Sequence, residues 1–374
     1  MRYLLHLIIF SEAAILSFLF TPLVIRLAMK YNIVDKPGKR KIHEKPKPLL
    51  GGVAIFSSFI LVVAGNILAF RFLHGEGWVE ALVPNVARIY PLVWRALPQL
   101  AIILAGGFFI HLLGLIDDVY KERVTYRQKF IFQIVIIAIV AVAGIRTQFM
   151  PGRFLDIVIT TVWIVGITNS FNLLDNLDGL TAGVAIISAA ILFVVAVLQG
   201  QIFFAFMLAA LAGSCLGFLR YNFHPSKLFM GDSGSLFLGF MFGAITVTGS
   251  YVVDSSASLL PIVLPALVLS IPLYDTFSVM FIRKREKRPL FIGDKSHFSH
   301  RLLDLGMSHR GTVVFIYLIN LCVGGIAVLM PYISVLGSAL ILAQAVGIYT
   351  LITILISVGK NNQKRATVHS NKRR

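Results

Sequence analysis

Long apolar runs alternate with short polar segments along almost the whole chain. Most of these runs approach the roughly 20 residues that a helix needs to cross a bilayer. They are Tyr3–Ala28, Leu49–Phe72, Leu97–Ile116, Phe130–Gly144, Leu155–Ile167, Leu180–Leu198, Ile202–Leu219, Ser235–Tyr251, Leu259–Ile282, Val313–Met330 and Ile333–Val358. The pattern predicts an all-α polytopic membrane protein with about eleven transmembrane helices, of which the fourth and fifth look shortest.

Composition agrees with this class. Hydrophobic residues make up 57% of the chain and charged residues only 14%, with a mean hydropathy of +0.84, whereas soluble domains are roughly 25% charged. The net charge of +17 suggests nucleic acid, but most basic residues lie in short loops between apolar runs, where they set topology and contact anionic lipid head groups. We therefore expect membrane lipids, and no nucleic acid, as partners.

Lysine and arginine are distributed unequally between the two sides of the membrane. If the eleven runs are spans, all but six of the 34 Lys and Arg residues fall on the side of the C-terminus. The exceptions are Arg2, Arg71, Arg88, Arg95, Arg146 and Arg153. Because short cytoplasmic loops carry the excess of positive charge, we predict the N-terminus outside and the C-terminus in the cytoplasm. Residues 1–359 are expected to form one integral-membrane domain, and residues 360–374 a basic, disordered cytoplasmic tail.

A polar stretch, Asn169–Leu180, follows directly on the fifth apolar run. On a helix Asn172, Asp175 and Asp178 are spaced by three, so they share one side. Unpaired carboxylates near hydrocarbon are costly and usually serve a ligand, and oxygen donors suit a hard divalent cation. Turn and capping chemistry explains the same residue types and stays open for this stretch taken alone.

Two other acidic clusters are predicted on the same, cytoplasmic side. Asp117 and Asp118 end the third run; on a helix they point about 100° apart, so one can face metal or substrate while the other faces a lysine or a backbone donor. Asp232 lies between Gly231 and Ser233 at the start of the eighth run, where a new helix offers free N–H groups. Each cluster alone is explained equally well as a solvated helix end, but together they indicate a site.

Histidines and an arginine occur together in the loop Lys295–Leu302, which contains His297, His300 and Arg301. Arginine suits bidentate phosphate recognition, and histidine can donate hydrogen bonds to the same group. Zinc is less attractive than magnesium or manganese, because the remaining candidate ligands are hard carboxylates. A merely basic interfacial loop is the alternative.

Taken in order, these motifs resemble the cytoplasmic signatures of the polyprenyl-phosphate N-acetylhexosamine-1-phosphate transferases of glycosyltransferase family 4. The segments that carry the resemblance are Lys36–His43, Gly51-Gly52, Gly114–Asp118, Asn169–Gly183, Lys227–Gly239 and Asp294–Arg301. The resemblance implies transfer of a sugar-1-phosphate from a UDP-N-acetylhexosamine to a polyprenyl phosphate, usually undecaprenyl phosphate, with Mg²⁺ (Mn²⁺ as the alternative) and release of UMP. It also implies a bacterial inner (plasma) membrane location with the site facing the cytoplasm, at the first membrane step of a surface glycan pathway.

The family roles transfer to the matching positions. The resemblance implies catalytic roles for Asp117, Asp118 and Asp175, and magnesium ligation by Asp178 and Asp232. It implies substrate-binding roles for Lys36, His43, Lys129, Asn169, Asn172, His297, His300 and Arg301. The histidine motif is similar to that of the branch that uses N-acetylglucosamine, but Ser299 stands where many members have a third histidine, so the exact sugar stays open, as does a homodimer.

Two other classes fit some of the same features. An intramembrane prenyltransferase also uses Asn and Asp clusters with magnesium, but it needs a second Asp-x-x-Asp cluster, and Asp232 stands alone. A secondary transporter places its carboxylates near the midplane, commonly in two related halves, whereas here they cluster on one side and no repeat is visible. For the transferase we favour direct attack by the lipid phosphate over a covalent phospho-aspartate.

Overall fold

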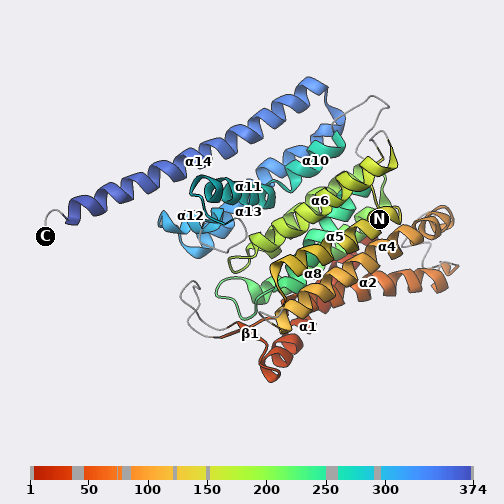
Figure 1. Ribbon diagram of the computed structural model, residues 1–374. Coiled ribbons are helices and arrows are strands. Elements are labelled where there is room, and N and C mark those ends of the chain that lie inside the picture. The colour runs from red at the N-terminus through yellow and green to blue at the C-terminus, as the bar shows by residue number, and fades with distance from the viewer. Residues whose placement is uncertain are drawn as a thin grey trace.

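The structure, a computed structural model, is built almost entirely from helices (Figure 1). It describes residues 4–35, 46–73, 75–77, 86–120, 124–148, 152–249, 260–289 and 296–371. Its helices are α1 (Leu4–Lys30), α2 (Gly51–Leu73), α4 (Val86–Val119), α5 (Tyr126–Val142), α6 (Arg153–Leu174), α7 (Leu180–Leu198), α8 (Ile202–Asn222), α9 (Asp232–Thr248), α10 (Leu260–Val268), α11 (Ser270–Arg285), α12 (Phe298–Asp304), α13 (His309–Ile326), the 3-10 helix η1 (Ala327–Tyr332) and α14 (Val335–Asn371). Two short antiparallel strands, β1 (Val34–Asp35) and β2 (Lys47–Pro48), pair with Val34 opposite Pro48.

Eight helices among the described residues are long and apolar enough to cross a membrane. They are Leu4–Lys30, Gly51–Leu73, Val93–Val119, Arg153–Leu174, Leu180–Leu198, Ile202–Asn222, His309–Tyr332 and Val335–Lys360. Every predicted span overlaps a helix, but α5 and α9 have only 17 residues each and the ninth span is divided. The chain is therefore a helical polytopic membrane protein, and the count of eleven stays a prediction.

Helix α9 forms the centre of the bundle. All its residues from Ser233 to Thr246 are buried, and it packs against α4 and α6. Because consecutive buried residues point to every side of a helix, α9 is surrounded by its neighbours along this length. Its first residue, Asp232, stands where this central helix reaches one end of the bundle.

The ninth predicted span, Leu259–Ile282, is wrong as a single helix. Helix α10 ends at Val268 and α11 begins at Ser270. Pro272 lies in the first turn of α11, where its missing N–H needs no partner; inside one continuous helix it would remove a hydrogen bond. After the break, α11 packs against α6 and α13, which brings it to the elements that carry the polar motifs.

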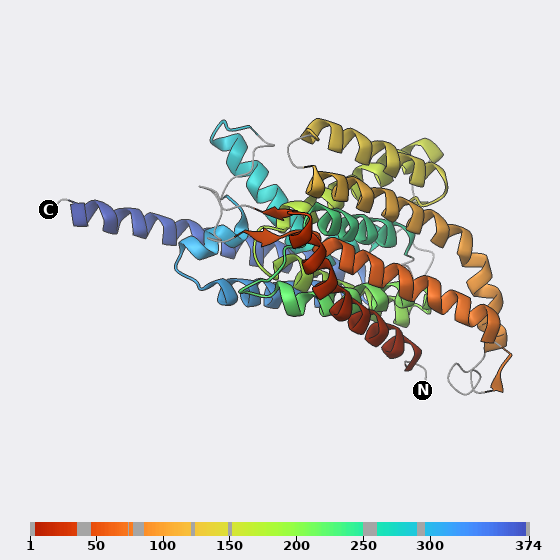
Figure 2. The same ribbon diagram turned by 90° about the horizontal axis from the view of Figure 1, so that it is seen from below.

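The two ends of the bundle are unlike each other. In Figure 2 the N-terminus lies at one end, whereas the two strands, α12 and the C-terminus lie at the other. An odd number of crossings places the termini in this way, and the absolute orientation in the membrane stays a prediction.

Helix α14 projects well beyond the rest of the bundle (Figure 1). It runs to Asn371, so helix continues into the stretch from residue 360 for which the sequence predicts disorder. Residues 360–371 contain neither glycine nor proline, so nothing in the local sequence stops the helix. The division into a membrane domain and a separate tail stays a prediction.

Candidate active site

The first turn of α9 is held by Asp118, at the end of α4. The Asp118 carboxylate accepts hydrogen bonds from the backbone N–H groups of Asp232 (2.8 Å) and Ser233 (3.0 Å), and the residue is buried. The first N–H groups of a helix have no partner within it and form the positive end of its dipole, so a carboxylate is stable there. Gly231 precedes them with φ +74°, and a Cβ on it would lie 2.5 Å from a carboxylate oxygen of Asp118. Asp118 thus fixes the place of Asp232.

Lys129 of α5 connects carboxylates from two other helices. Its Nζ lies 3.1 Å from Oδ2 of Asp117 and also donates to Oδ2 of Asp232. Helix α5 begins with a capping box, in which the Thr125 hydroxyl accepts the N–H of Gln128, and this fixes the turn that carries Lys129. One ammonium between two carboxylates leaves a net negative charge, which a cation of higher charge can also satisfy.

Two asparagines on α6 connect that helix to its neighbours. Nδ2 of Asn172 donates to Oδ1 of Asp232 (2.9 Å) and to the hydroxyl of Ser235 (3.0 Å). About one turn earlier, Nδ2 of Asn169 donates to Oε1 of Gln133 on α5 (2.7 Å). Asn172 therefore joins the cluster around Asp232. We call Asp117, Asp118, Lys129, Asn172 and Asp232 the acidic group.

Asp175 follows the last residue of α6 and lies within reach of the charges of the acidic group. Burial, together with the negative charges of Asp232, Asp118 and Asp178, raises the pKa of Asp175 from 3.8 to about 7. A carboxyl group with a pKa near neutrality exchanges a proton readily under physiological conditions. Asp175 is therefore suited to accept a proton in this site.

Asp178 lies in a network of its own. Its Oδ2 accepts from Nζ of Lys47 (3.3 Å) and the N–H of Ser226 (3.1 Å) and lies 3.0 Å from Nδ1 of His224, while its Oδ1 accepts the Ser226 hydroxyl (2.7 Å). Burial alone would raise the pKa of Asp178, but the hydrogen bonds from Ser226 and the charge of Lys47 hold it below its ordinary value.

These four contacts engage both oxygens of Asp178, which the sequence resemblance predicts to bind magnesium together with Asp232. Among the described residues, no three His, Cys, Asp or Glu side chains form a group that could hold a metal ion. The metal-binding roles of Asp178 and Asp232 stay predictions.

The loop with the histidines is anchored to α11 by Asp275. Oδ2 of Asp275 lies 2.8 Å from Nδ1 of His297, and its Oδ1 accepts the N–H of Phe298 (2.5 Å), the first residue of α12. Asp275 is 1% exposed and His297 5%. The carboxylate holds the imidazole in one orientation, with Nδ1 directed at Asp275 and Nε2 available to another partner. We call His297–Arg301 the histidine loop.

Ser299 connects the histidine loop to the turn after α6. Its hydroxyl donates to Oδ1 of Asn176, which lies between Asp175 and Asp178 in the chain, and Ser299 is buried. Ser299 therefore fixes the distance between the loop and the acidic turn.

Arg301 and His300 are the other residues of the histidine loop that the sequence predicts to bind phosphate. Nη2 of Arg301 donates to the hydroxyl of Ser278 on α11 (2.6 Å), and its guanidinium lies 5.9 Å from the ring centroid of Phe298. The His300 ring centroid is 6.4 Å from that of His297. All three predicted phosphate-binding side chains thus come from one short loop packed on α11.

Two predicted substrate-binding residues, Lys36 and His43, lie outside the described residues. The others lie at the same end of the bundle, in the acidic group, the turn after α6 and the histidine loop, with Asn169 beside them. Their roles in substrate binding and catalysis stay predictions.

Sequence reasoning missed four residues that hold the site in place. Asp275 had a clear signal, because it is the only charged residue in the apolar run Leu259–Ile282. Lys47, His224 and Ser226 had none beyond lying in polar loops, since their partner Asp178 is distant in the chain.

Comparison with known proteins gives a consistent result. The model for glycosyl transferase family 4 matches residues 100–250. The chain is 35% identical over 328 residues to a protein of Bacillus subtilis named probable undecaprenyl-phosphate N-acetylglucosaminyl 1-phosphate transferase, covering 85% of this chain and 83% of the relative. It is 33% identical to decaprenyl-phosphate N-acetylglucosaminephosphotransferase of Mycolicibacterium smegmatis (82% and 77% covered). It is 27% identical to undecaprenyl-phosphate alpha-N-acetylglucosaminyl 1-phosphate transferase of Yersinia pestis (90% and 84% covered).

Proposed function

Because this chain belongs to glycosyl transferase family 4, as its motifs predict, we propose that it transfers N-acetylglucosamine-1-phosphate from UDP-N-acetylglucosamine to undecaprenyl phosphate. An oxygen of the lipid phosphate attacks the sugar-bearing phosphorus of the nucleotide sugar. A new diphosphate bond forms, the bond to the nucleotide breaks, and UMP leaves. The named relatives act on a polyprenyl phosphate and an N-acetylglucosamine phosphate, which supports both substrate classes.

The observation that carries the proposal is the acidic group, with Lys129 between Asp117 and Asp232. Two anionic substrates can approach each other only where cations offset their repulsion. Lys129 supplies one such charge from the first turns of α5. Phe132, Val135 and Ile139 of the same helix are exposed on the outside of the bundle. A lipid phosphate that reaches Lys129 from the membrane would meet the nucleotide sugar beside Asp175.

Magnesium fits this place by the chemistry of its donors. Asp117 and Asp232 present carboxylate oxygens to one cation, and hard oxygens are the ligands that Mg²⁺ prefers. When bound there, Mg²⁺ would offset the charge of the diphosphate. We propose Asp232 as the main ligand with Asp117 beside it, whereas Asp178, with four donors of its own, would shape the turn that carries Asp175.

The remaining residues divide the work between the two substrates. Asp175, with its pKa near 7, would accept the proton or organise the charge of the attacking phosphate. The histidine loop would hold the diphosphate of the nucleotide sugar: Nε2 of His297 and the guanidinium of Arg301 are donors that suit phosphate oxygens.

We further propose that the protein lies in a bacterial inner membrane and crosses it eleven times. The site would face the cytoplasm, the compartment in which nucleotide sugars are made. The excess of Lys and Arg on the side of the polar motifs supports this orientation. A homodimer remains a proposal from the sequence alone.

The test is an assay of purified protein with undecaprenyl phosphate and a panel of nucleotide sugars. We expect release of UMP with UDP-N-acetylglucosamine, dependence on Mg²⁺, and a loss of at least a hundredfold in Asp232→Asn. Asp156→Asn is the matched control, since Asp156 is a buried carboxylate bonded to Thr147 (2.9 Å) in the first turn of α6, away from the polar motifs. Release of inorganic diphosphate from a prenyl diphosphate instead of UMP would assign the protein to a prenyltransferase and refute the proposal.

A further inference from the structure

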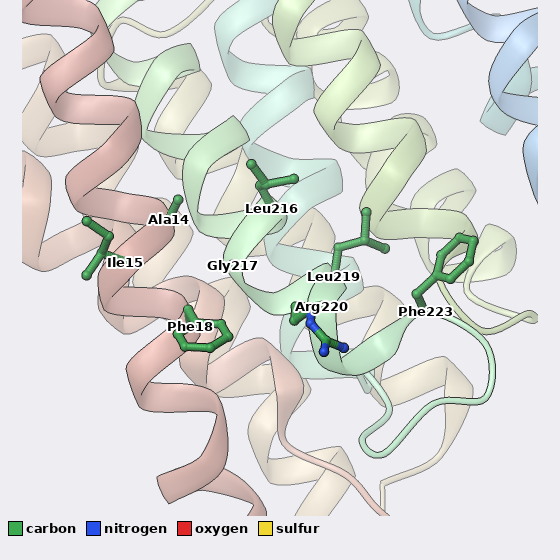
Figure 3. A pocket seen from close by; sticks show the side chains of 8 residues that line it. All are labelled: Ala14, Ile15, Phe18, Leu216, Gly217, Leu219, Arg220 and Phe223. Carbon is green, nitrogen blue, oxygen red and sulfur yellow. The ribbon is translucent and has the colours of Figure 1, made fainter.

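A shallow groove runs over the outer side of α8, at the end where the chain turns toward Asp232. Its volume is about 610 Å³, within the range of small-molecule sites. Figure 3 shows Ile15 and Phe18 of α1 along one side, Leu216 and Leu219 of α8 along its floor, and Arg220 and Phe223 at its end. No residue of the acidic group or the histidine loop lines it.

The apolar floor and walls of the groove face outward from the bundle. Leu216, Leu219, Arg220 and Phe223 are spaced by three and four residues, so they lie on one face of α8. Leu216 is 41% exposed, and Ile15, opposite it on α1, is 57% exposed. In a membrane protein, side chains exposed in this way contact lipid chains.

The groove is kept open by the close contact of α1 and α8 beneath it. A Cβ on Gly217 would lie 2.2 Å from the backbone oxygen of Ala14, and one on Gly213 would lie 2.2 Å from that of Phe10. Glycines four residues apart allow two membrane helices to touch along their backbones, so the larger side chains on either side stand apart.

Arg220 gives this apolar groove a charged end. It is exposed in the last turn of α8, and within the described part of the chain no hydrogen bond or ion pair of its guanidinium is recorded. Lys227 is exposed. It lies near Arg220, because its N–H donates to the backbone oxygen of Tyr221, the residue after Arg220. A guanidinium presents paired donors that match phosphate oxygens.

We propose that this groove binds an anionic glycerophospholipid, with the lipid phosphate at Arg220 and one acyl chain along Leu216, Ile15 and Phe18. The charge at the membrane boundary and the apolar surface above it match the two parts of such a lipid. Basic pockets between membrane helices are a recurrent form of head-group site. The occupant is a membrane lipid other than the acceptor.

Two observations separate this lipid from the polyprenyl phosphate acceptor. The acceptor phosphate is assigned to Lys129 and Asp117, which come from α5 and α4 and not from the helices that form the groove. In addition, Phe223 and Leu219 close the groove against the turn after α6, since a Cβ on Gly179 would lie 3.0 Å from the Phe223 ring and 3.5 Å from Leu219. The groove therefore meets this turn through apolar side chains, and no carboxylate of the acidic group lines it.

The same packing gives the bound lipid a role. Asn222, one turn from Leu219, accepts the N–H of Gly179 through its Oδ1 (3.0 Å), and His224, next to Phe223, contacts Asp178 (3.0 Å). A lipid that steadies the end of α8 therefore steadies the turn between Asp178 and α7.

The test is native mass spectrometry of the full-length protein with phosphatidylglycerol and phosphatidylcholine of matched acyl chains. We expect the wild type to retain one phosphatidylglycerol in preference to phosphatidylcholine, and Arg220→Gln to lower this preference about fivefold, the effect of one basic residue near a membrane surface. Arg220→Lys should keep most of it. Arg26→Gln is the matched control. Arg26 is an exposed arginine near the C-terminal end of α1, one of the two helices that form the groove, but it does not line the groove.

A second variant separates the groove from the charge alone. Leu216→Trp keeps Arg220 but fills the groove, and it should lower the retention of both phospholipids. An unchanged preference in Arg220→Gln would overturn the proposal. So would displacement of phosphatidylglycerol by equimolar undecaprenyl phosphate, which would assign the groove to the acceptor, or loss of a protein dimer in Arg220→Gln, which would assign it to a second copy of the chain. None of these measurements depends on the transferase activity.

Discussion

Replacing Asp275 by asparagine tests whether the histidine loop acts through its anchor on α11. The carboxylate makes two contacts, with Nδ1 of His297 (2.8 Å) and with the N–H of Phe298 (2.5 Å). Asparagine has the same shape but only one acceptor oxygen. If that oxygen keeps the N–H of Phe298, the amide nitrogen faces His297, whose Nδ1 must then accept a hydrogen bond. The negative charge beside the imidazole is also lost, so a hydrogen bond from Nε2 to a phosphate oxygen is weakened.

The magnitude follows from the contacts that are lost. Asp275→Asn removes one charge-assisted hydrogen bond and preserves the cap of α12, so the orientation of His297 is weakened by roughly 1.5–3 kcal/mol. This corresponds to a loss of about ten- to a hundredfold in kcat/KM for the nucleotide sugar. Asp275→Ala removes both contacts and leaves a buried N–H unpaired, which should lower the free energy of unfolding by about 1–3 kcal/mol as well.

The assay is UMP release by purified protein, with the nucleotide sugar and the lipid phosphate varied separately and thermal unfolding measured in parallel. We expect Asp275→Asn to unfold close to the wild-type temperature and to leave the KM for the lipid phosphate unchanged. Asp156→Asn controls for the loss of a buried carboxylate as such, because Asp156 hydrogen-bonds Thr147 far along α6 from the histidine loop. It should leave both substrate constants unchanged.

Additivity decides whether Asp275 acts through His297. If it does, the double variant Asp275→Asn/His297→Gln should be no slower than His297→Gln alone, since residues in one network do not contribute independently. Additive losses would refute the reasoning, and so would a defect confined to the lipid substrate.

Three further changes test the acidic group and the turn after it. Lys129→Met should lower kcat/KM at least a hundredfold, because it removes the ammonium proposed to meet the lipid phosphate and the partner of Asp117 and Asp232. Steady-state kinetics at several Mg²⁺ concentrations would measure the loss, and wild-type turnover would contradict it. Asp118→Asn should lower the free energy of unfolding by about 1–2 kcal/mol, since one amide oxygen cannot accept both N–H groups at the start of α9, whereas Asp117→Asn should reduce turnover with little change in thermal unfolding. Because burial raises the pKa of Asp175 to about 7, a base at this position is lost by protonation as the pH falls below that value, so kcat at saturating lipid should decrease about tenfold per unit well below pH 7; a profile that is flat from pH 5.5 to 8 would exclude this role.

The fold could be predicted from the sequence wherever hydropathy alone decides it. Apolar runs place the helices because the backbone N–H and C=O groups of a segment in lipid must be hydrogen-bonded without water, and a helix does this within one segment. Run length does not show where a helix breaks: Leu269 separates α10 from α11 inside one continuous apolar run. Pro272 is the local signal for this break, but hydropathy alone does not register it.

The family could also be predicted, because ordered motifs are visible in the sequence, and so could the gathering of the polar motifs at one end of the bundle. The pairing of side chains could not. Asp178 is 48 residues from Ser226, and Asp275 is 22 residues from His297. Spacing on a helix predicts neighbours only within a few residues, so contacts of this kind appear only when the helices are packed.

The two neighbouring aspartates show how far local geometry extends. Their side chains diverge by about 100° on α4, which predicts two different environments, and the structure gives Asp117 a lysine and Asp118 the N–H groups of α9. Which partners they meet depends on the central position of α9 in the bundle. The sequence around residues 117 and 118 does not specify that position. Asp118 and Asn172 fix Asp232 from two helices, so under the proposed function a cation held by Asp232 would need little rearrangement of its ligands when charge develops on the transferred phosphate. A cation site arranged in advance in this way would stabilise that charge at little reorganisation cost, and the buried cap of α9 would then contribute to the proposed chemistry as much as the residues that touch the substrates.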